Sequence, residues 1–171
     1  MDVEVVSVGT ALPERADFDD FVATTEPRLR RALVAAYGPE AGREATADSL
    51  AWAWQNWDRL SAMENPAGYL WRVGQTSVRS AARRRQRELT AVVEVDLEPL
   101  DGHREPQVEP ALEGALADLS PQQRAAVVLV HGYGYSLSEA AGVLACSVST
   151  VRNHVQRALR RLHAALEVSD D

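Results

Sequence analysis

The chain has 171 residues, enough for one ordinary domain or two small ones. Its 18 basic residues are all arginine and stand against 25 acidic residues, so the formal net charge is −7. A single cysteine excludes an internal disulfide framework and a cysteine-cluster metal site, and no apolar run is long enough to span a membrane. The first residues lack the basic start of a signal peptide, so we expect a soluble, cytoplasmic protein without membrane insertion.

Charge is distributed unevenly along the chain. Residues 67–90 hold six arginines and one acidic residue, whereas residues 91–120 hold one arginine and eight acidic residues. Phosphate binding depends on the local electrostatic field and not on the total charge. Segment 67–90 is therefore a candidate nucleic-acid-binding surface, although the whole chain is acidic.

The first half is predicted to be a leader, residues 1–16, followed by a helical domain, residues 17–88. Apolar residues at helical spacing begin at Phe18, and Pro27 is expected to kink or restart this first helix. A second helix opens with Pro39 in its first turn. Its apolar face, which we expect to be buried, consists of Ala47, Leu50, Ala51 and Trp54.

A third helix is predicted to begin at Asn65 and Pro66, an N-cap residue followed by proline at the first helical position. This helix carries the basic segment to about Glu88. Residues 89–110, which contain several prolines and many acidic residues, are predicted to be a flexible acidic linker.

The second half, residues 111–167, is predicted to be another small helical domain. Ser120 with Gln123, and Ser136 with Glu139, have the spacing of capping boxes, which mark helix starts. The last helix has an apolar stripe, expected to be buried, that consists of Val148, Val151, Val155, Leu159, Leu162 and Leu166. The predicted fold is therefore all-α, with two small helical domains and few contacts between them.

The end of the chain has the organisation of a helix-turn-helix: a short capped helix, a tight turn at residues 145–147 and a longer helix. In that unit the second helix enters the major groove of DNA. The candidate DNA-binding residues in its first turns are Ser147, Ser149, Thr150, Arg152, Asn153, Gln156 and Arg157. Asparagine and glutamine suit adenine, and arginine suits guanine or phosphate. An ordinary helical hairpin is the alternative interpretation.

The predicted third helix carries a row of residues spaced to lie on one face, namely Arg72, Thr76, Arg79, Arg83 and Arg87. Guanidinium groups bind phosphates bidentately. The nearby aromatic residues Trp57, Tyr69 and Trp71 offer surfaces on which unpaired bases stack. The alternative is a solvated arginine face with the aromatic side chains in the core.

No catalytic pattern occurs in the sequence. HExxH, GxGxxG, Walker and GxSxG motifs are missing, and the four histidines do not have the spacing of metal ligands. Cys146 lies in the predicted turn, where a packed thiol is expected. We therefore expect neither enzymatic activity nor a cofactor or metal ion. A small-molecule binder built on a helical bundle, the third hypothesis, has no supporting residues.

Residues 120–166 resemble region 4 of bacterial sigma factors of the extracytoplasmic-function (ECF) group, most clearly in GYSLSEAAGVLACSVSTVRNHVQRALRRL. Residues 17–85 resemble region 2 of the same family, most specifically in NPAGYLWRVGQTSVRSAARRR. The segment GREATADSLAWAWQNWDRL is similar to the preceding helix of that region. The two regions occur in the family's order, with no third-region domain between them.

The resemblance implies a protein that binds core RNA polymerase, recognises the minus-thirty-five promoter element with region 4 and opens the minus-ten element with region 2. It implies that Glu44 and Asp48 contact the clamp helices of the largest polymerase subunit, and that an anti-sigma factor is a partner. The residues implied in minus-ten recognition and melting are Met63, Glu64, Asn65, Arg72, Gln75, Thr76, Arg79, Arg83 and Arg84. The loop before the third helix would hold a flipped base.

The string VSTVRNH also resembles the last helix of LuxR-type regulators. A DNA-binding transcriptional regulator without sigma activity is therefore the alternative hypothesis. That family pairs its helix-turn-helix with a receiver or ligand-binding domain, and residues 17–88 resemble neither.

Overall fold

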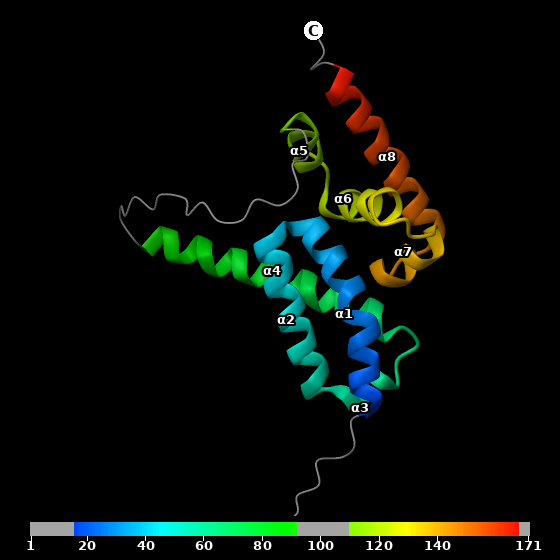
Figure 1. Ribbon diagram of the computed structural model, residues 1–171. Helices are drawn as coiled ribbons and strands as arrows, with labels where there is room; N and C mark the ends of the chain where they lie inside the picture. The colour runs from blue at the N-terminus through cyan, green and yellow to red at the C-terminus, as the bar shows by residue number, and fades with distance from the viewer. Residues whose placement is uncertain (1–15, 92–109, 168–171) are drawn as a thin grey trace, which may run out of the picture.

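The computed structural model describes residues 16–91 and 110–167, which are helical with short connections (Figure 1). These two ranges contain no β-strand, and the predicted all-α class is confirmed. Residues 1–15 of the predicted leader and residues 92–109 of the predicted linker lie outside the described residues, whereas residues 89–91 continue the helix that precedes the linker. None of the helices in the described ranges combines the length and the hydropathy needed to cross a bilayer.

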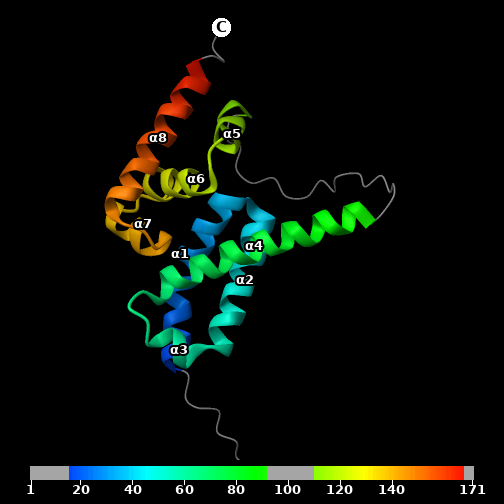
Figure 2. The ribbon, with the colours of Figure 1, turned by 180° about the vertical axis from the view of Figure 1, so that it is seen from behind.

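The first group of helices comprises α1 (Ala16–Tyr37), α2 (Pro39–Gln55), α3 (Trp57–Ser61) and α4 (Pro66–Ala91). Helices α1, α2 and α4 pack against one another, and α4 crosses the α1–α2 pair in the view of Figure 2. Helix α1 continues through Pro27 and does not restart there. Helix α3 is one short turn that the sequence pattern did not separate from α2.

Helix α2 approaches α1 closely through a face of small residues. A Cβ atom on Gly42 would lie 2.5 Å from the Cα of Val34, so only glycine fits there. The buried residues of α2 are Gly42, Ala45, Thr46, Ser49 and Ala53. The hydroxyls of Thr46 and Ser49 each donate to the carbonyl one turn earlier at 2.7 Å, which satisfies them in the core.

The predicted apolar face of α2 is therefore wrong. Ala47 and Ala51 are exposed, Leu50 is half-buried, and Trp54 is 43% exposed. Two helices that pack at short distance bury small residues at their contact. Because the prediction relied on large apolar residues, it selected a face of α2 that points away from α1. This exposed side of α2, made of Glu44, Ala47, Asp48, Ala51 and Trp54, is called the α2 outer face below.

The second group comprises α5 (Pro110–Ala117), α6 (Pro121–Val127), the π-helical turn η1 (Val128–Gly132), α7 (Leu137–Leu144) and α8 (Val148–Glu167). Both predicted capping boxes are present, at the starts of α6 and α7. In the apolar stripe of α8, Val151 and Val155 are buried as predicted and Leu159 is half-buried, but Val148 is 39% exposed at the first position of the helix.

The two groups of helices share one core, so the prediction of few contacts between them is wrong. Leu29 and Leu33 of α1 belong to the same buried cluster as Ala126, Leu129 and Ala140 of the second group. Helix α6 packs on α1, and α7 packs on α4. The second group is too small to bury all its apolar surface internally. The apolar surfaces of α6 and α7 that α8 does not cover therefore pack against α1 and α4.

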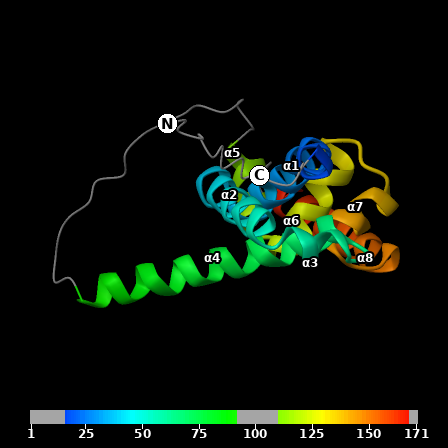
Figure 3. The ribbon, with the colours of Figure 1, turned by 90° about the horizontal axis from the view of Figure 1, so that it is seen from below.

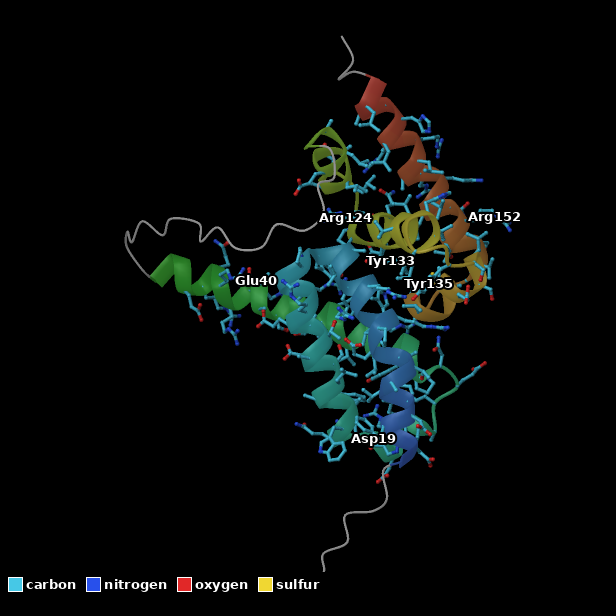
Figure 4. The ribbon with its side chains drawn as sticks, viewed as in Figure 1. Asp19, Glu40, Arg124, Tyr133, Tyr135 and Arg152 are labelled. Atoms are coloured by element: carbon cyan, nitrogen blue, oxygen red, sulfur yellow. The ribbon has the colours of Figure 1, made fainter. Side chains whose placement is uncertain are left out.

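Polar contacts reinforce this packing. The guanidinium of Arg31 donates to the Tyr135 hydroxyl at 3.3 Å and lies 5.0 Å from the centre of the Tyr133 ring. Figure 4 shows both tyrosines on the side of the second group that faces α1. Arg124 of α6 donates to the carbonyl of Ala36 at 3.3 Å, at the end of α1.

The C-terminal half of α4 extends beyond the rest of the molecule (Figure 3). Every residue from position 82 to position 88 is exposed. This segment contains four arginines and no large apolar residue, so it has nothing to bury against the core. The basic segment is therefore presented to solvent as a long helical rod.

Candidate nucleic-acid interface

The side chains of the predicted basic row on α4 are exposed to solvent, although the first of them, Arg72, also donates to the carbonyl of Ala145. Arg72, Thr76, Arg79, Arg83 and Arg87 are all exposed. Arg84, at its end, is also exposed and lies 3.8 Å from Glu88 in an ion pair that bulk water screens. The row presents guanidinium groups at successive helical turns, an arrangement that suits a phosphate backbone.

The aromatic residues near this row belong to the core, as the alternative interpretation has it. Trp71 is 2% exposed and its ring lies 6.3 Å from that of Tyr37. Trp57 packs edge-on against Phe18 at 5.1 Å, and Tyr69 packs against Trp52. The prediction that Trp71 offers a surface for stacking bases is wrong because no base can reach it.

The loop before α4 combines a helix cap with an open cleft. Asn65 caps the helix, since its Oδ1 accepts a hydrogen bond from the backbone N–H of Gly68 at 2.9 Å. Glu64 is exposed, and Met63 is half-buried. Met63, Tyr69 and Arg72 line one side of a cleft of about 350 Å³, and residues of the second helical group, among them Ala141 and Gly142, line the other side.

Gln75, another member of the predicted minus-ten set, is half-buried and interacts with the side chain of Tyr37 on α1. Burial raises the pKa of Tyr37, and the interaction with Gln75 opposes that shift. Gln75 thus supports the joint between α1 and α4 in this arrangement.

The first turns of α8 form a second exposed polar face. Arg152, Asn153, Gln156 and Arg157 are all exposed. Figure 4 shows Arg152 projecting away from α1 and α2. Long polar side chains on successive turns of a helix that follows a tight turn have the placement needed to contact base edges in a major groove.

Three hydroxyl groups gather at the start of α8. Ser147 caps the helix by accepting from the backbone N–H of Thr150 at 3.1 Å. The Ser147 hydroxyl also pairs with the hydroxyls of Ser149 at 2.9 Å and Thr150 at 2.8 Å. The positive end of the helix dipole lies here, so this cluster suits a phosphate group.

The turn between α7 and α8 is built from two small residues. Ala145 has the left-handed backbone conformation, with φ at 53°, which ends α7. Cys146 is half-buried, and burial raises the pKa of its thiol, as expected of a packed cysteine. On α8, burial and then the charge of Arg157 lower the pKa of His154.

The α2 outer face carries the two predicted polymerase-binding residues. Glu44 and Asp48 lie one turn apart and both are exposed. Asp48 accepts a hydrogen bond from the Ser77 hydroxyl of α4. Between and beyond the carboxylates lie the methyl groups of Ala47 and Ala51 and the exposed edge of Trp54, so the face is both acidic and apolar.

Comparison with known proteins connects these surfaces. The family described as Sigma-70, region 4 matches residues 110–162. The RNA polymerase sigma-E factor of Streptomyces coelicolor is 29% identical over 159 residues, which cover 92% of this chain and 90% of that protein. The ECF RNA polymerase sigma factor EcfG of Rhodopseudomonas palustris is 29% identical over 162 residues, which cover 88% of this chain and 84% of that protein.

Residues 110–162 thus match region 4 of the sigma-70 family, and nearly the whole chain is similar to ECF sigma factors. Solved structures agree with this similarity. The chain resembles the sigma factor RpoE of Bartonella quintana, solved with the anti-sigma factor NepR, with a TM-score of 0.60 and 25% identity over 89% of this chain and 98% of that one. Its fold also resembles CnrH, solved with the cytosolic domain of CnrY, with a TM-score of 0.53 and 23% identity over 91% of each chain.

These matches extend across both helical groups of the chain, and they favour a sigma factor over the LuxR-like alternative. The sequence pattern missed Trp54 as a surface residue, although an indication was available: alanines alternate with carboxylates at helical spacing on that side of α2. It also missed the contacts of Asn65 and Arg72 with the second group, which no local pattern encodes.

Proposed function

We propose that this chain is a sigma factor, which binds core RNA polymerase through the α2 outer face, recognises the minus-thirty-five element with α8 and opens the minus-ten element with α4 and the loop before it. The observation that carries the proposal is that one chain exposes two separate polar helix faces, the arginine row of α4 and the first turns of α8. A transcriptional regulator that only binds duplex DNA through its helix-turn-helix would need the α8 face but not the arginine row of α4.

Polymerase binding is assigned to Glu44, Asp48 and the apolar residues around them. Exposed carboxylates attract basic partner residues and steer association, while Ala47, Ala51 and Trp54 supply apolar contact area. A helix face with small residues at its centre lets another helix approach closely. The partner that fits is the pair of clamp helices of the largest polymerase subunit.

Minus-thirty-five recognition is assigned to Arg152, Asn153, Gln156 and Arg157, with the hydroxyl cluster at the start of α8 placed against a phosphate. Each good bidentate contact with a base is worth about 1–3 kcal/mol of discrimination. The phosphate contacts set the position of the helix in the groove and contribute affinity without sequence preference.

Promoter opening is assigned to the arginine row and to the cleft beside it. The row would hold the phosphates of the separated strand. An unstacked base would contact Met63 and Tyr69, which line the α4 side of the cleft, with Glu64 and Asn65 supplying polar contacts. Unstacking a base costs a few kcal/mol, which these contacts must return.

An anti-sigma factor is the proposed regulator. The similar sigma factor RpoE was solved in complex with a partner of that kind, the anti-sigma factor NepR. By analogy, a partner that covers the α2 outer face or the α4 row would prevent polymerase or promoter binding.

The melting assignment is tested with Met63→Ala/Glu64→Ala in the assembled holoenzyme on a promoter mapped from genomic fragments. We expect unchanged closed-complex formation and reduced permanganate reactivity of thymines near the start site. Glu113→Ala, an exposed change on α5, serves as the control. If the double variant opens the promoter as well as the parent, the flipped-base cleft is wrong and only the electrostatic role of α4 stands.

A further inference from the structure

Two of the residues assigned to the melted strand are engaged by the second helical group. The Nδ2 group of Asn65 donates to the carbonyl of Gly142 at 2.9 Å. Arg72 donates from its guanidinium to the carbonyl of Ala145 at 3.3 Å. Both acceptors lie at the C-terminal end of α7, so the side chains that would face DNA instead face protein backbone.

These bonds satisfy groups that α7 leaves open. The last four carbonyls of a helix have no partner within it, and the C-terminal end carries partial negative charge. The left-handed residue Ala145 ends α7, and its own N–H bonds the Ala141 carbonyl. Asn65 then caps the Gly142 carbonyl, and the Arg72 guanidinium lies at the negative end of the helix. The end of α7 is therefore complementary to the surface that contains Asn65 and Arg72, which is called the minus-ten surface below.

Close packing brings the two elements within reach. Gly68, on the first turns of α4, is buried against Ala145. A Cβ atom on Gly68 would lie 3.0 Å from the Cβ of Ala145 and 2.4 Å from Nδ2 of Asn65. Only glycine therefore permits the contact between α4 and the end of α7 together with the Asn65 bond to Gly142.

The minus-thirty-five reader is not covered in the same arrangement. The side chains of Arg152, Asn153 and Gln156 are exposed, and Figure 4 shows Arg152 directed away from the first helical group. The packing of the two helical groups thus leaves the α8 face exposed and occupies the part of the α4 face that contains Asn65 and Arg72.

We propose that the end of α7 is a latch on the minus-ten surface of the free chain. In the latched chain the first turns of α8 are free to bind duplex DNA, while Asn65 and Arg72 are bonded to the end of α7. Single-stranded DNA can bind these two side chains only when α7 separates from α4. This regulation rests on the proposed function. It predicts that single-stranded DNA and an open latch favour each other, because a ligand shifts a conformational equilibrium toward the state that it binds better.

The test measures the distance between spin labels on α4 and α8 of the full chain by pulsed electron resonance. The labels are attached at Ser80→Cys and His163→Cys, both exposed, with Cys146→Ala removing the native thiol. The probes are a mixed-sequence single-stranded 12-mer and the duplex of the same sequence. We expect the single strand to lengthen the distance and the duplex to leave it unchanged.

Two glycine variants separate the latch from general effects on helix stability. Gly68→Ala forces Asn65 away from Gly142 and presses on Ala145, so the long-distance population should rise without DNA, by about tenfold from a minor open state. Gly142→Ala makes the same chemical change in α7, where an added Cβ meets no atom within 4 Å, and should leave the distance unchanged.

The latch is wrong if Gly68→Ala keeps the distance distribution of Gly142→Ala, or if single strand and duplex shift the distance equally. Transcription by the holoenzyme is measured separately. Failure to transcribe with an intact response of the labels would overturn the proposed function and leave the latch standing.

Discussion

Asp48 on α2 accepts a hydrogen bond from the hydroxyl of Ser77 on α4. One of the two carboxylates proposed to contact polymerase is thus tied to the helix proposed to bind the melted strand. Ser77 lies between Arg72 and Arg79 in the sequence of α4, so a partner that docks on Asp48 would lie beside the helix that carries the arginine row.

Reversing the charge of the α2 outer face should weaken polymerase binding. Glu44→Arg/Asp48→Arg places like charges against basic partner residues, an arrangement that costs several kcal/mol, so affinity for core polymerase should fall at least tenfold. The effect should shrink as salt rises. Titration of labelled chain with core polymerase measures it.

Asp20→Arg/Asp58→Arg makes the same change in charge on α1 and α3, at exposed positions away from the α2 outer face. This control should bind polymerase like the parent. Equal loss in both double variants would mean that total charge, and not the α2 outer face, governs assembly.

Two tryptophans should respond differently to truncation. Trp71→Ala removes a side chain that is 2% exposed and should lower the free energy of unfolding by about 3–5 kcal/mol. Trp54 is 43% exposed and packs edge-on against Phe18 at 5.1 Å, so Trp54→Ala should cost on the order of 1–2 kcal/mol. Urea unfolding followed by circular dichroism compares them. The corrected orientation of α2 fails if Trp54→Ala is the more damaging change.

Individual alanine variants on α8 should divide into two classes. Replacing a base-reading residue among Arg152, Asn153, Gln156 and Arg157 should cost about 1–3 kcal/mol and relax specificity at one promoter position. Replacing a phosphate-binding residue should lower affinity for all sequences and flatten the dependence on salt. Selection from randomised duplexes, run for each variant, assigns the classes. Unchanged sequence preference in all four variants would remove α8 from promoter recognition.

The capping box of α7 should make stability sensitive to acid. Hydrogen bonds from the backbone N–H and the hydroxyl of Ser136 lower the pKa of Glu139 below its ordinary value. A lowered folded-state pKa stabilises the fold above the unfolded-state pKa, and this contribution is lost as the pH falls through the folded-state value. Glu139→Gln should therefore flatten the loss of stability below about pH 4.3.

The matched control is Glu113→Gln on α5, at an exposed position for which no such pair of bonds occurs among the described residues. Thermal unfolding between neutral and acidic pH measures both variants. A parent-like acid dependence in Glu139→Gln would show that the cap does not contribute through its charge.

Local chemistry explains which elements could be predicted from the sequence. Ser120 with Gln123, and Ser136 with Glu139, form capping boxes within four residues, so each helix start is encoded locally. The stripe of α8 that contains Val151 and Val155 was found because large apolar residues recur at helical spacing. The exposure of the arginine row on α4 followed from the same periodicity.

Packing between distant segments could not be predicted in this way. The buried side of α2 is decided by how closely Gly42 lets α2 approach Val34, a fact about α1 that the α2 pattern does not contain. The bonds from Asn65 to Gly142 and from Arg72 to Ala145 join residues more than 70 positions apart. The sequence therefore indicated which residues carry the chemistry but not which of them the compact fold leaves open.

Run-off transcription with purified core polymerase tests the central claim most directly. Core polymerase of the source organism is incubated with genomic fragments, with and without the chain, and the transcript starts are mapped. We predict defined starts that depend on the chain and disappear with Glu44→Arg/Asp48→Arg. Specific duplex binding by the chain without any chain-dependent start would contradict the account and favour a regulator without sigma activity.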